Sequence, residues 1–199
     1  ATLDRLEAWQ AQMIPFLEAQ KPVVTGLPNH RLGCHWIADL YRQSDLEYMA
    51  ALRPPVIKIV NPSRDRVAEA FARVDSNGHV ALRYHPPSEQ QAELAANPAG
   101  LGIAHAQYWI NQLNTTYKEF DRSRICVMGI NEPSIHNAAE ATRVAVYTEN
   151  FLKTLQPHNM RSYVFNFSVG WSREEAGRIV WDEFLHLEPL INATRSFGC

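Results

Sequence analysis

A carboxylic acid flanked by an amide and a proline stands at the end of one of the most apolar runs of the sequence. Residues 127–130 lead directly into Asn131, Glu132 and Pro133. Burial at a strand end would raise the pKa of the Glu132 carboxyl, as a general acid working near neutral pH requires, and Asn131 could hydrogen-bond a substrate hydroxyl. Glu132 could equally cap a helix that begins after Pro133. Both interpretations stay open on the chemistry of these residues.

Basic side chains lie inside or directly after other apolar runs, where a charge is costly unless it has a partner. Lys58, Arg83 and His85 are the residues in question. The guanidinium of Arg83 could orient a carboxylate through two hydrogen bonds. The alternative for Lys58 and Arg83 is a structural ion pair.

Aromatic and amide side chains accompany two further apolar runs. His35 and Trp36 lie in the first, Asn166 lies in the last, and Trp171 follows it. Ligand sites combine aromatic faces with a few placed hydrogen-bonding groups, so His35, Asn166 and Trp171 are candidate substrate-binding residues. Trp36 and Trp171 are candidate stacking platforms, although a tryptophan can also simply belong to the core.

The elements that must position these side chains are short apolar runs that alternate with stretches of helical periodicity. The expected strands are 32–37, 56–61, 80–85, 125–131 and 163–168, and the expected helices are 3–19, 44–52, 64–74, 100–120, 138–155 and 173–193. Strands that alternate with helices predict parallel βαβ units and an α/β fold. Near-continuous apolar strands are typical of a sheet whose two faces are both covered.

The loops distinguish a barrel from a nucleotide-binding sheet. No expected strand is followed by the glycine-rich patterns that cradle phosphates. Polar residues instead gather at the carboxyl ends of the strands, where a (β/α)8 TIM barrel places its active site. We therefore expect residues 1–199 to form one domain with the first five β/α units of such a barrel.

The position of the Asn131-Glu132-Pro133 motif at the end of the fourth expected strand resembles the clan A glycoside hydrolases. The resemblance implies a retaining glycoside hydrolase that acts on O-glycosidic bonds of a poly- or oligosaccharide. Glu132 would then be the general acid/base, and Asn131 would bind the sugar hydroxyl next to the reacting carbon. Arg83 matches a place where the family often carries a basic residue near the catalytic pair.

A retaining mechanism also needs a carboxylate nucleophile about 5–5.5 Å from the acid/base. The family places it at the end of the seventh strand. A typical complete barrel has about 250 residues, so we expect that the 199 residues are an incomplete barrel and that the nucleophile lies beyond them.

The composition excludes several other classes of function. A formal net charge of -2 with scattered charges gives no reason to expect a nucleic-acid or membrane partner. The three cysteines show no metal-ligand spacing, and we expect neither a metal nor another cofactor. The oligomeric state stays open, as does the compartment of this soluble chain, with secretion slightly favoured over the cytoplasm.

Two alternatives compete with the hydrolase. One is a non-catalytic barrel relative that binds carbohydrate in the same place. The other is a phosphate- or metal-dependent barrel enzyme that uses Lys58, His35, His85 and Glu132. The absence of an HxH or HExxH pair and of a glycine-rich phosphate loop weighs against the second alternative.

Overall fold

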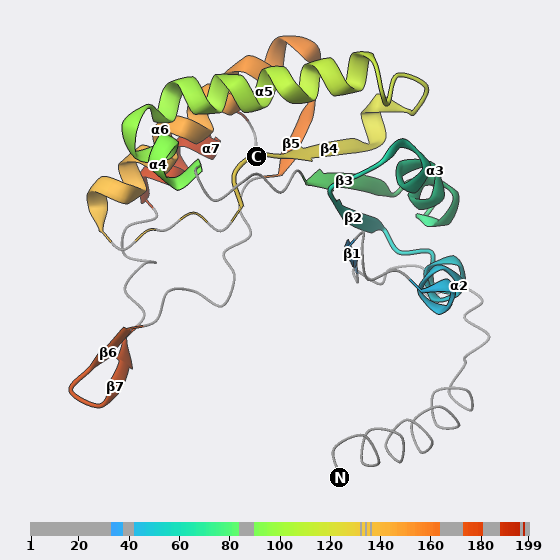
Figure 1. Cartoon of the computed structure of the whole chain (residues 1–199), viewed down its shortest axis with the longest axis horizontal. Coiled ribbons are helices and arrows are strands. Elements are labelled where there is room, and N and C mark those ends of the chain that lie inside the picture. The colour runs from blue at the N-terminus through green and yellow to red at the C-terminus, as the bar shows by residue number, and fades with distance from the viewer. Residues whose placement is uncertain are drawn as a thin grey trace.

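Five strands lie side by side in one parallel sheet, in the order in which they occur along the chain (Figure 1). The computed structural model describes residues 33–37, 42–83, 90–131, 133, 135, 137–163, 173–180, 188–195 and 197. The strands are β1 (Cys34–Ile37), β2 (Val56–Val60), β3 (His79–Arg83), β4 (Ile125–Met128) and β5 (Arg161–Tyr163). Right-handed crossovers place successive parallel strands next to each other. The predicted α/β class and the order of the five strands are confirmed.

Three of the helices begin after a residue whose side chain accepts a hydrogen bond from a backbone N–H of the first turn. The helices are α2 (Gln43–Leu52), α3 (Arg64–Arg73), α4 (Gln90–Ala96), α5 (Pro98–Asn114), α6 (Ala138–Leu155) and α7 (Glu188–Arg195), with short 3-10 helices at Arg122–Arg124 and Gln156–His158. The side chains of Ser63, Asn97 and Asn137 accept hydrogen bonds from the first turns of α3, α5 and α6. These caps stabilise the three helix starts next to the sheet.

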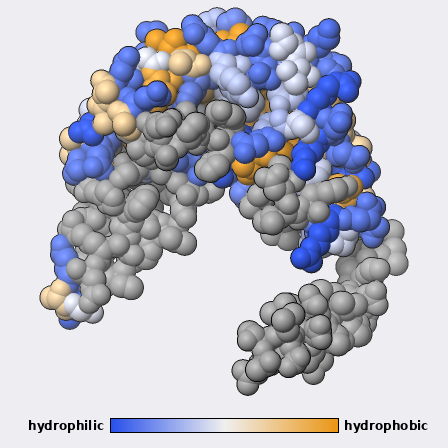
Figure 2. Space-filling view, viewed as in Figure 1, coloured by the Kyte–Doolittle hydropathy of each residue, from blue (hydrophilic) through white to orange (hydrophobic). Residues whose placement is uncertain are grey.

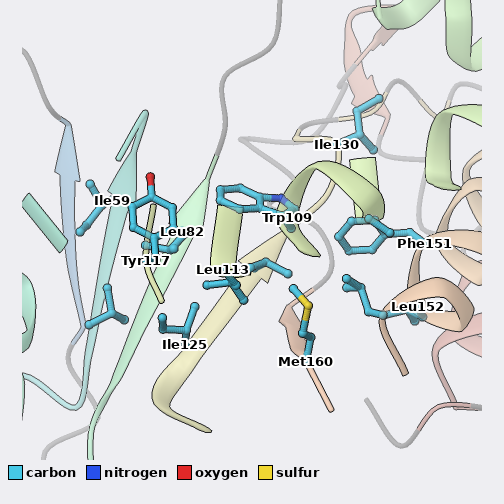
Figure 3. Close-up of a cluster of buried hydrophobic side chains, with 14 of the residues drawn as sticks. Ile59, Leu82, Trp109, Leu113, Tyr117, Ile125, Ile130, Phe151, Leu152 and Met160 are labelled. Atoms are coloured by element: carbon cyan, nitrogen blue, oxygen red, sulfur yellow. The ribbon is translucent and has the colours of Figure 1, made fainter. Parts of the chain in front are cut away.

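One face of the sheet is apolar and packs against helices; we call it the helix-facing face. Its residues have relative exposures of 0–1%, and they are Ile57, Ile59, Val80, Leu82, Ile125 and Val127. They belong to one core cluster with Val67 of α3, Trp109 and Leu113 of α5 and Phe151 of α6. Figure 3 shows Ile59, Leu82 and Ile125 in the same cluster as Trp109 and Leu113. Side chains alternate along a strand, so the intervening residues point to the other face.

Helices α5 and α6 pack closely because a glycine faces the crossing. A Cβ atom on Gly102 would overlap the carbonyl oxygen of Tyr147, and it would also lie 3.1 Å from the backbone nitrogen of Phe151. Neither backbone atom can turn away as a side chain could. Glycine at position 102 therefore allows the two helix backbones to approach each other.

The predicted helix 173–193 is wrong in its first part. Residues Arg173–Glu175 (β6) and Arg178–Val180 (β7) form an antiparallel hairpin, which stands apart from the five-stranded sheet in Figure 1, and α7 covers Glu188–Arg195. Ala176 and Gly177 join the strands with φ values of 51° and 75°. Positive φ at both central residues is the geometry of a tight hairpin turn, which glycine adopts easily and a helix cannot contain.

Other boundaries differ from the expectation by a few residues. Strand β4 ends at Met128 rather than at Asn131, β5 begins two residues earlier than expected, and α5 ends at Asn114 rather than at residue 120. Helix α4 was not predicted. The expected helix 3–19 and the expected strand residues 164–168 lie outside the described residues.

The surface seen in Figure 2 over α3, α5 and α6 is mostly hydrophilic, with small hydrophobic spots. Exposed large apolar side chains in the described residues include Tyr48, Ile103, Tyr108 and Ile191. None of the helices described by the structure is long and apolar enough to cross a membrane.

Candidate functional site

Along each strand, the residues between the core positions point to the second face of the sheet. Several of these residues are polar, and we call this face the polar face. Strand register places His35, Lys58, Cys126 and Arg161 at one level, and Arg83, Met128 and Tyr163 at the next level toward the carboxyl ends. Paired positions in neighbouring parallel strands point to the same face, and so do residues two apart in one strand. Chemical groups from all five strands therefore share the polar face.

Side chains from β2 and β5 meet above this face. The Nζ atom of Lys58 lies 5.7 Å from the centre of the Tyr163 ring, although β3 and β4 separate the two strands. Side chains perpendicular to a flat sheet would stay about 14 Å apart across three strand spacings. Lys58 and Tyr163 therefore converge over the strands between them, and the ammonium group interacts with the face of the ring.

The hydroxyl of Tyr163 is buried at the same level as Arg83. Burial raises the pKa of Tyr163, and the nearby positive charge of Arg83 offsets only part of that rise. The phenol is thus protonated at neutral pH. Its oxygen has no hydrogen-bond partner within the described part of the chain, so the group retains a donor and an acceptor that another molecule could use.

Asn131 lies in a bend three residues beyond the end of β4. Its side chain is half-buried, and its Oδ1 atom is buried without a hydrogen-bond donor among the residues that the structure describes. A buried polar atom left unsatisfied costs about 1–3 kcal/mol. Such an acceptor is suited to a hydroxyl group from a bound molecule.

Two side chains, one from α5 and one from α6, form hydrogen bonds with the segment that leads to Asn131. Trp109 donates its indole N–H to the Met128 carbonyl at 2.8 Å, and Ile130 donates its backbone N–H to the Tyr147 hydroxyl at 2.8 Å. The same hydroxyl lies 2.8 Å from Nδ1 of His105. The backbone after β4 is therefore attached to both helices.

The predicted site residues fall into two groups. Lys58 and Arg83 lie on the polar face, His35 lies on the same face in β1 with an exposed side chain, and Asn131 follows β4. Glu132, His85, Asn166 and Trp171 lie outside the described residues. Their convergence with Arg83 on one site stays a prediction.

Trp36 belongs to the core, which is one of the two roles that the sequence left open for it. Its side chain is 5% exposed, belongs to the core cluster and lies 5.6 Å from the guanidinium carbon of Arg66 on α3. Register pairs Trp36 with Ile59, which places it on the helix-facing face. The strand position, and not the residue type, decides this role.

Tyr163 is the residue of this face that the sequence did not indicate. The apolar run suggested that Tyr163 begins the fifth strand, whereas β5 begins at Arg161 and pairs Tyr163 with Met128. Because β5 begins two residues earlier than expected, Tyr163 lies toward the carboxyl end of β5 and not at its amino end. The alternation of Arg161 and Tyr163 across a single serine is the available sequence signal.

The two described cysteines, Cys34 in β1 and Cys126 in β4, are free, half-buried thiols. Burial raises the pKa of Cys34 and also of Cys126, where the charge of Arg161 opposes the effect. Both side chains are therefore protonated and poorly nucleophilic at neutral pH. Within the described ranges, no three His, Cys, Asp or Glu side chains are grouped as metal ligands would be.

Comparisons of the chain with family models, with curated proteins and with solved structures find no match.

Proposed function

We propose that the chain is part of a retaining glycoside hydrolase that cleaves O-glycosidic bonds of a poly- or oligosaccharide. Glu132 is the general acid/base in this proposal, and Asn131 binds the sugar hydroxyl next to the reacting carbon. The observation that carries the proposal is the buried, unsatisfied Oδ1 atom of Asn131 directly beyond the fourth strand of an in-order parallel sheet. An acceptor in that place matches the role that the resemblance assigns to Asn131.

We further propose that the five strands are consecutive strands in the wall of a (β/α)8 barrel. The unbroken strand order supports this, because in a doubly wound sheet the order of the strands reverses next to a central strand. The location of the described core helices α3, α5 and α6 on one face supports it as well (Figure 1). The convergence of Lys58 and Tyr163 over two intervening strands fits a sheet that curves toward the polar face.

In the proposed reaction, the Glu132 carboxyl donates its proton to the departing glycosidic oxygen and later removes a proton from the attacking water. Arg83 supplies a positive charge beside the neutral Tyr163 phenol, and it orients carboxylates or sugar oxygens through hydrogen bonds. Lys58, His35, His85, Asn166 and Trp171 are proposed substrate contacts. By the resemblance, the nucleophile is a carboxylate of a seventh strand, outside residues 1–199.

The test compares two substrates of Glu132→Gln in the protein that carries the complete barrel. Hydrolysis of a glycoside with a sugar leaving group should fall about 10²–10⁴-fold, because proton donation to the leaving oxygen is lost. The first, glycosylating step of an activated aryl glycoside should fall much less. Glu149→Gln, on the exposed side of α6, is the matched control and should keep the activity on both substrates.

Equal losses on both substrates would remove Glu132 from the acid/base role. Carbohydrate binding without turnover in the unmodified complete protein would instead favour a non-catalytic barrel relative that holds sugar at the same edge.

A further inference from the structure

We propose that Tyr147 is a positioning residue of this site, and that together with His105 it holds the backbone that presents Asn131 and Glu132. This inference rests on the proposed hydrolase function. Tyr147 lies on α6 and His105 lies on α5, so the two helices that cover β4 jointly determine where that strand delivers its polar residues.

The hydroxyl of Tyr147 bridges the strand end and the helix. It accepts a hydrogen bond from the backbone N–H of Ile130, the residue before Asn131. The same hydroxyl lies 2.8 Å from Nδ1 of His105, and it donates its hydrogen to Nδ1 when the ring carries its own hydrogen on Nε2. Nδ1 can accept only if it carries no proton, which requires a neutral imidazole with its hydrogen on Nε2. Burial lowers the pKa of His105 to about 4, in agreement with a neutral ring at pH 7.

The contact between the Tyr147 hydroxyl and the segment after β4 is tightly packed. The side chain of Tyr147 is 1% exposed, and a Cβ atom on Gly129 would overlap its hydroxyl oxygen. Glycine at position 129 thus lets the phenol reach the backbone of the segment. One residue earlier, the indole N–H of Trp109 holds the Met128 carbonyl. The backbone is attached at residues 128 and 130, on both sides of the glycine.

Such attachment matters for a reaction more than for stability. Strand β4 ends at Met128, so the ladder of the sheet no longer holds residues 129–131. A displacement of about 1 Å at a reacting group can cost roughly 10²-fold in rate. The hydroxyl of Tyr147 supplies the missing constraint immediately before Asn131, although it does not itself lie at the polar face.

The test uses Tyr147→Phe, which keeps the ring and its stacking on Phe151 but removes the hydroxyl. The matched control is Tyr117→Phe. Tyr117 is 3% exposed, and its hydroxyl donates to the Pro62 carbonyl at 2.7 Å, in the loop after β2. Tyr147→Phe removes two hydrogen bonds, with the Ile130 N–H and with Nδ1 of His105, whereas Tyr117→Phe removes one, so thermal stability should fall in both variants and more in Tyr147→Phe. Only Tyr147→Phe releases the segment after β4.

Two measurements distinguish positioning from stability. In the 199-residue chain, hydrogen exchange at the Ile130 amide should accelerate at least about tenfold more in Tyr147→Phe than in Tyr117→Phe, because only one variant removes its acceptor. In the complete protein, kcat for a glycoside with a sugar leaving group should fall about 10–100-fold in Tyr147→Phe, with KM changed less than about threefold. The activated aryl glycoside should lose less in its glycosylating step.

His105→Phe tests the same positioning role through the second side chain of the pair. If the two side chains act as a unit, the double variant with Tyr147→Phe should lose little more kcat than Tyr147→Phe alone.

Equal kinetic losses in Tyr147→Phe and Tyr117→Phe, with equal exchange at Ile130, would overturn the positioning role and leave the hydrolase proposal standing. If the unmodified complete protein hydrolyses no glycoside, the proposed function fails, and with it the reaction that Tyr147 is proposed to serve.

Discussion

The two faces of the parallel sheet use the same strands for different purposes. On the helix-facing face, Ile57, Ile59 and Leu82 are completely buried. On the polar face, Lys58 and Arg83 occupy the intervening positions, where they are only half-buried. Lys58 and Arg83 thus carry charge directly beside core residues of the same strands, on a face that also includes the buried side chains of Val60, Ala81 and Met128. The difference teaches that the composition of an apolar run does not reveal a site, whereas its alternation does.

The side chains behind the helix-facing face also act on the segment that begins where β4 ends. Trp109 and Tyr147 are core residues by burial, yet each uses a polar atom to hold the backbone between Met128 and Asn131. The core therefore determines where the candidate site stands. Removal of a single polar atom from one of these residues should therefore change catalysis more than it changes the free energy of unfolding.

The largest expected effect is on the helix-facing face. Ile59→Ala should lower the free energy of unfolding by about 2–5 kcal/mol, because it removes a fully buried side chain and leaves a cavity. Chemical denaturation measures it. Val56→Ala, in the same strand at 37% exposure, is the control and should cost much less. Equal costs would mean that β2 does not bury one face against the helices.

The pH dependence of stability should reveal the buried imidazole of His105. Its pKa is about 4 in the folded chain and about 6.5 when unfolded, so the unfolded state binds the extra proton between these values. Stability should fall by about 2–3 kcal/mol as the pH drops from 6.5 to 4, and it should be fully present above pH 6.5.

The measurement is urea unfolding across that pH range. His105→Asn keeps a side-chain acceptor near the Tyr147 hydroxyl but cannot titrate, so its stability should depend less on pH by this amount. An unchanged pH slope in the variant would show that His105 is not held neutral.

A smaller effect is expected where the two helices cross. Gly102→Ala should destabilise the chain by about 1–3 kcal/mol, since the new methyl group meets the backbone of α6 and the helices must separate. Thermal unfolding measures the cost. Ala104→Gly, at an exposed position of the same helix, is a control for helix propensity alone and should cost about 0.5–1 kcal/mol. A neutral Gly102→Ala would contradict the close packing of α5 on α6.

The smallest stability effect should come from the polar face. Lys58→Met keeps the length of the side chain and removes the charge over the Tyr163 ring, so unfolding should change by about 1 kcal/mol or less. Substrate affinity of the complete protein should fall nevertheless if Lys58 contacts the sugar. A loss as large as that of Ile59→Ala would assign Lys58 to the core and remove the contrast between the two faces.

Periodicity was sufficient to predict the five strands, their order and most of the helices, because each run had to bury one face. It failed at residues 173–180, where a turn with positive φ at Ala176 and Gly177 overrides helical spacing. It also misplaced Tyr163, since a shift of register changes the level of a side chain along the sheet, and it left Trp36 open between the core and the site. The contact of Tyr147 with Ile130 joins residues 17 apart, and no local pattern encodes it.

The most direct test of the central claim is azide rescue of Glu132→Gln in the protein that carries the complete barrel, with an activated aryl glycoside as substrate. Hydrolysis of the covalent intermediate needs the acid/base to activate water, whereas azide needs no base. We predict that added azide raises turnover of the variant and yields a glycosyl azide with the anomeric configuration of the substrate. No acceleration by azide, or a glycosyl azide of inverted configuration, would contradict the assignment of Glu132 as the acid/base of a retaining hydrolase.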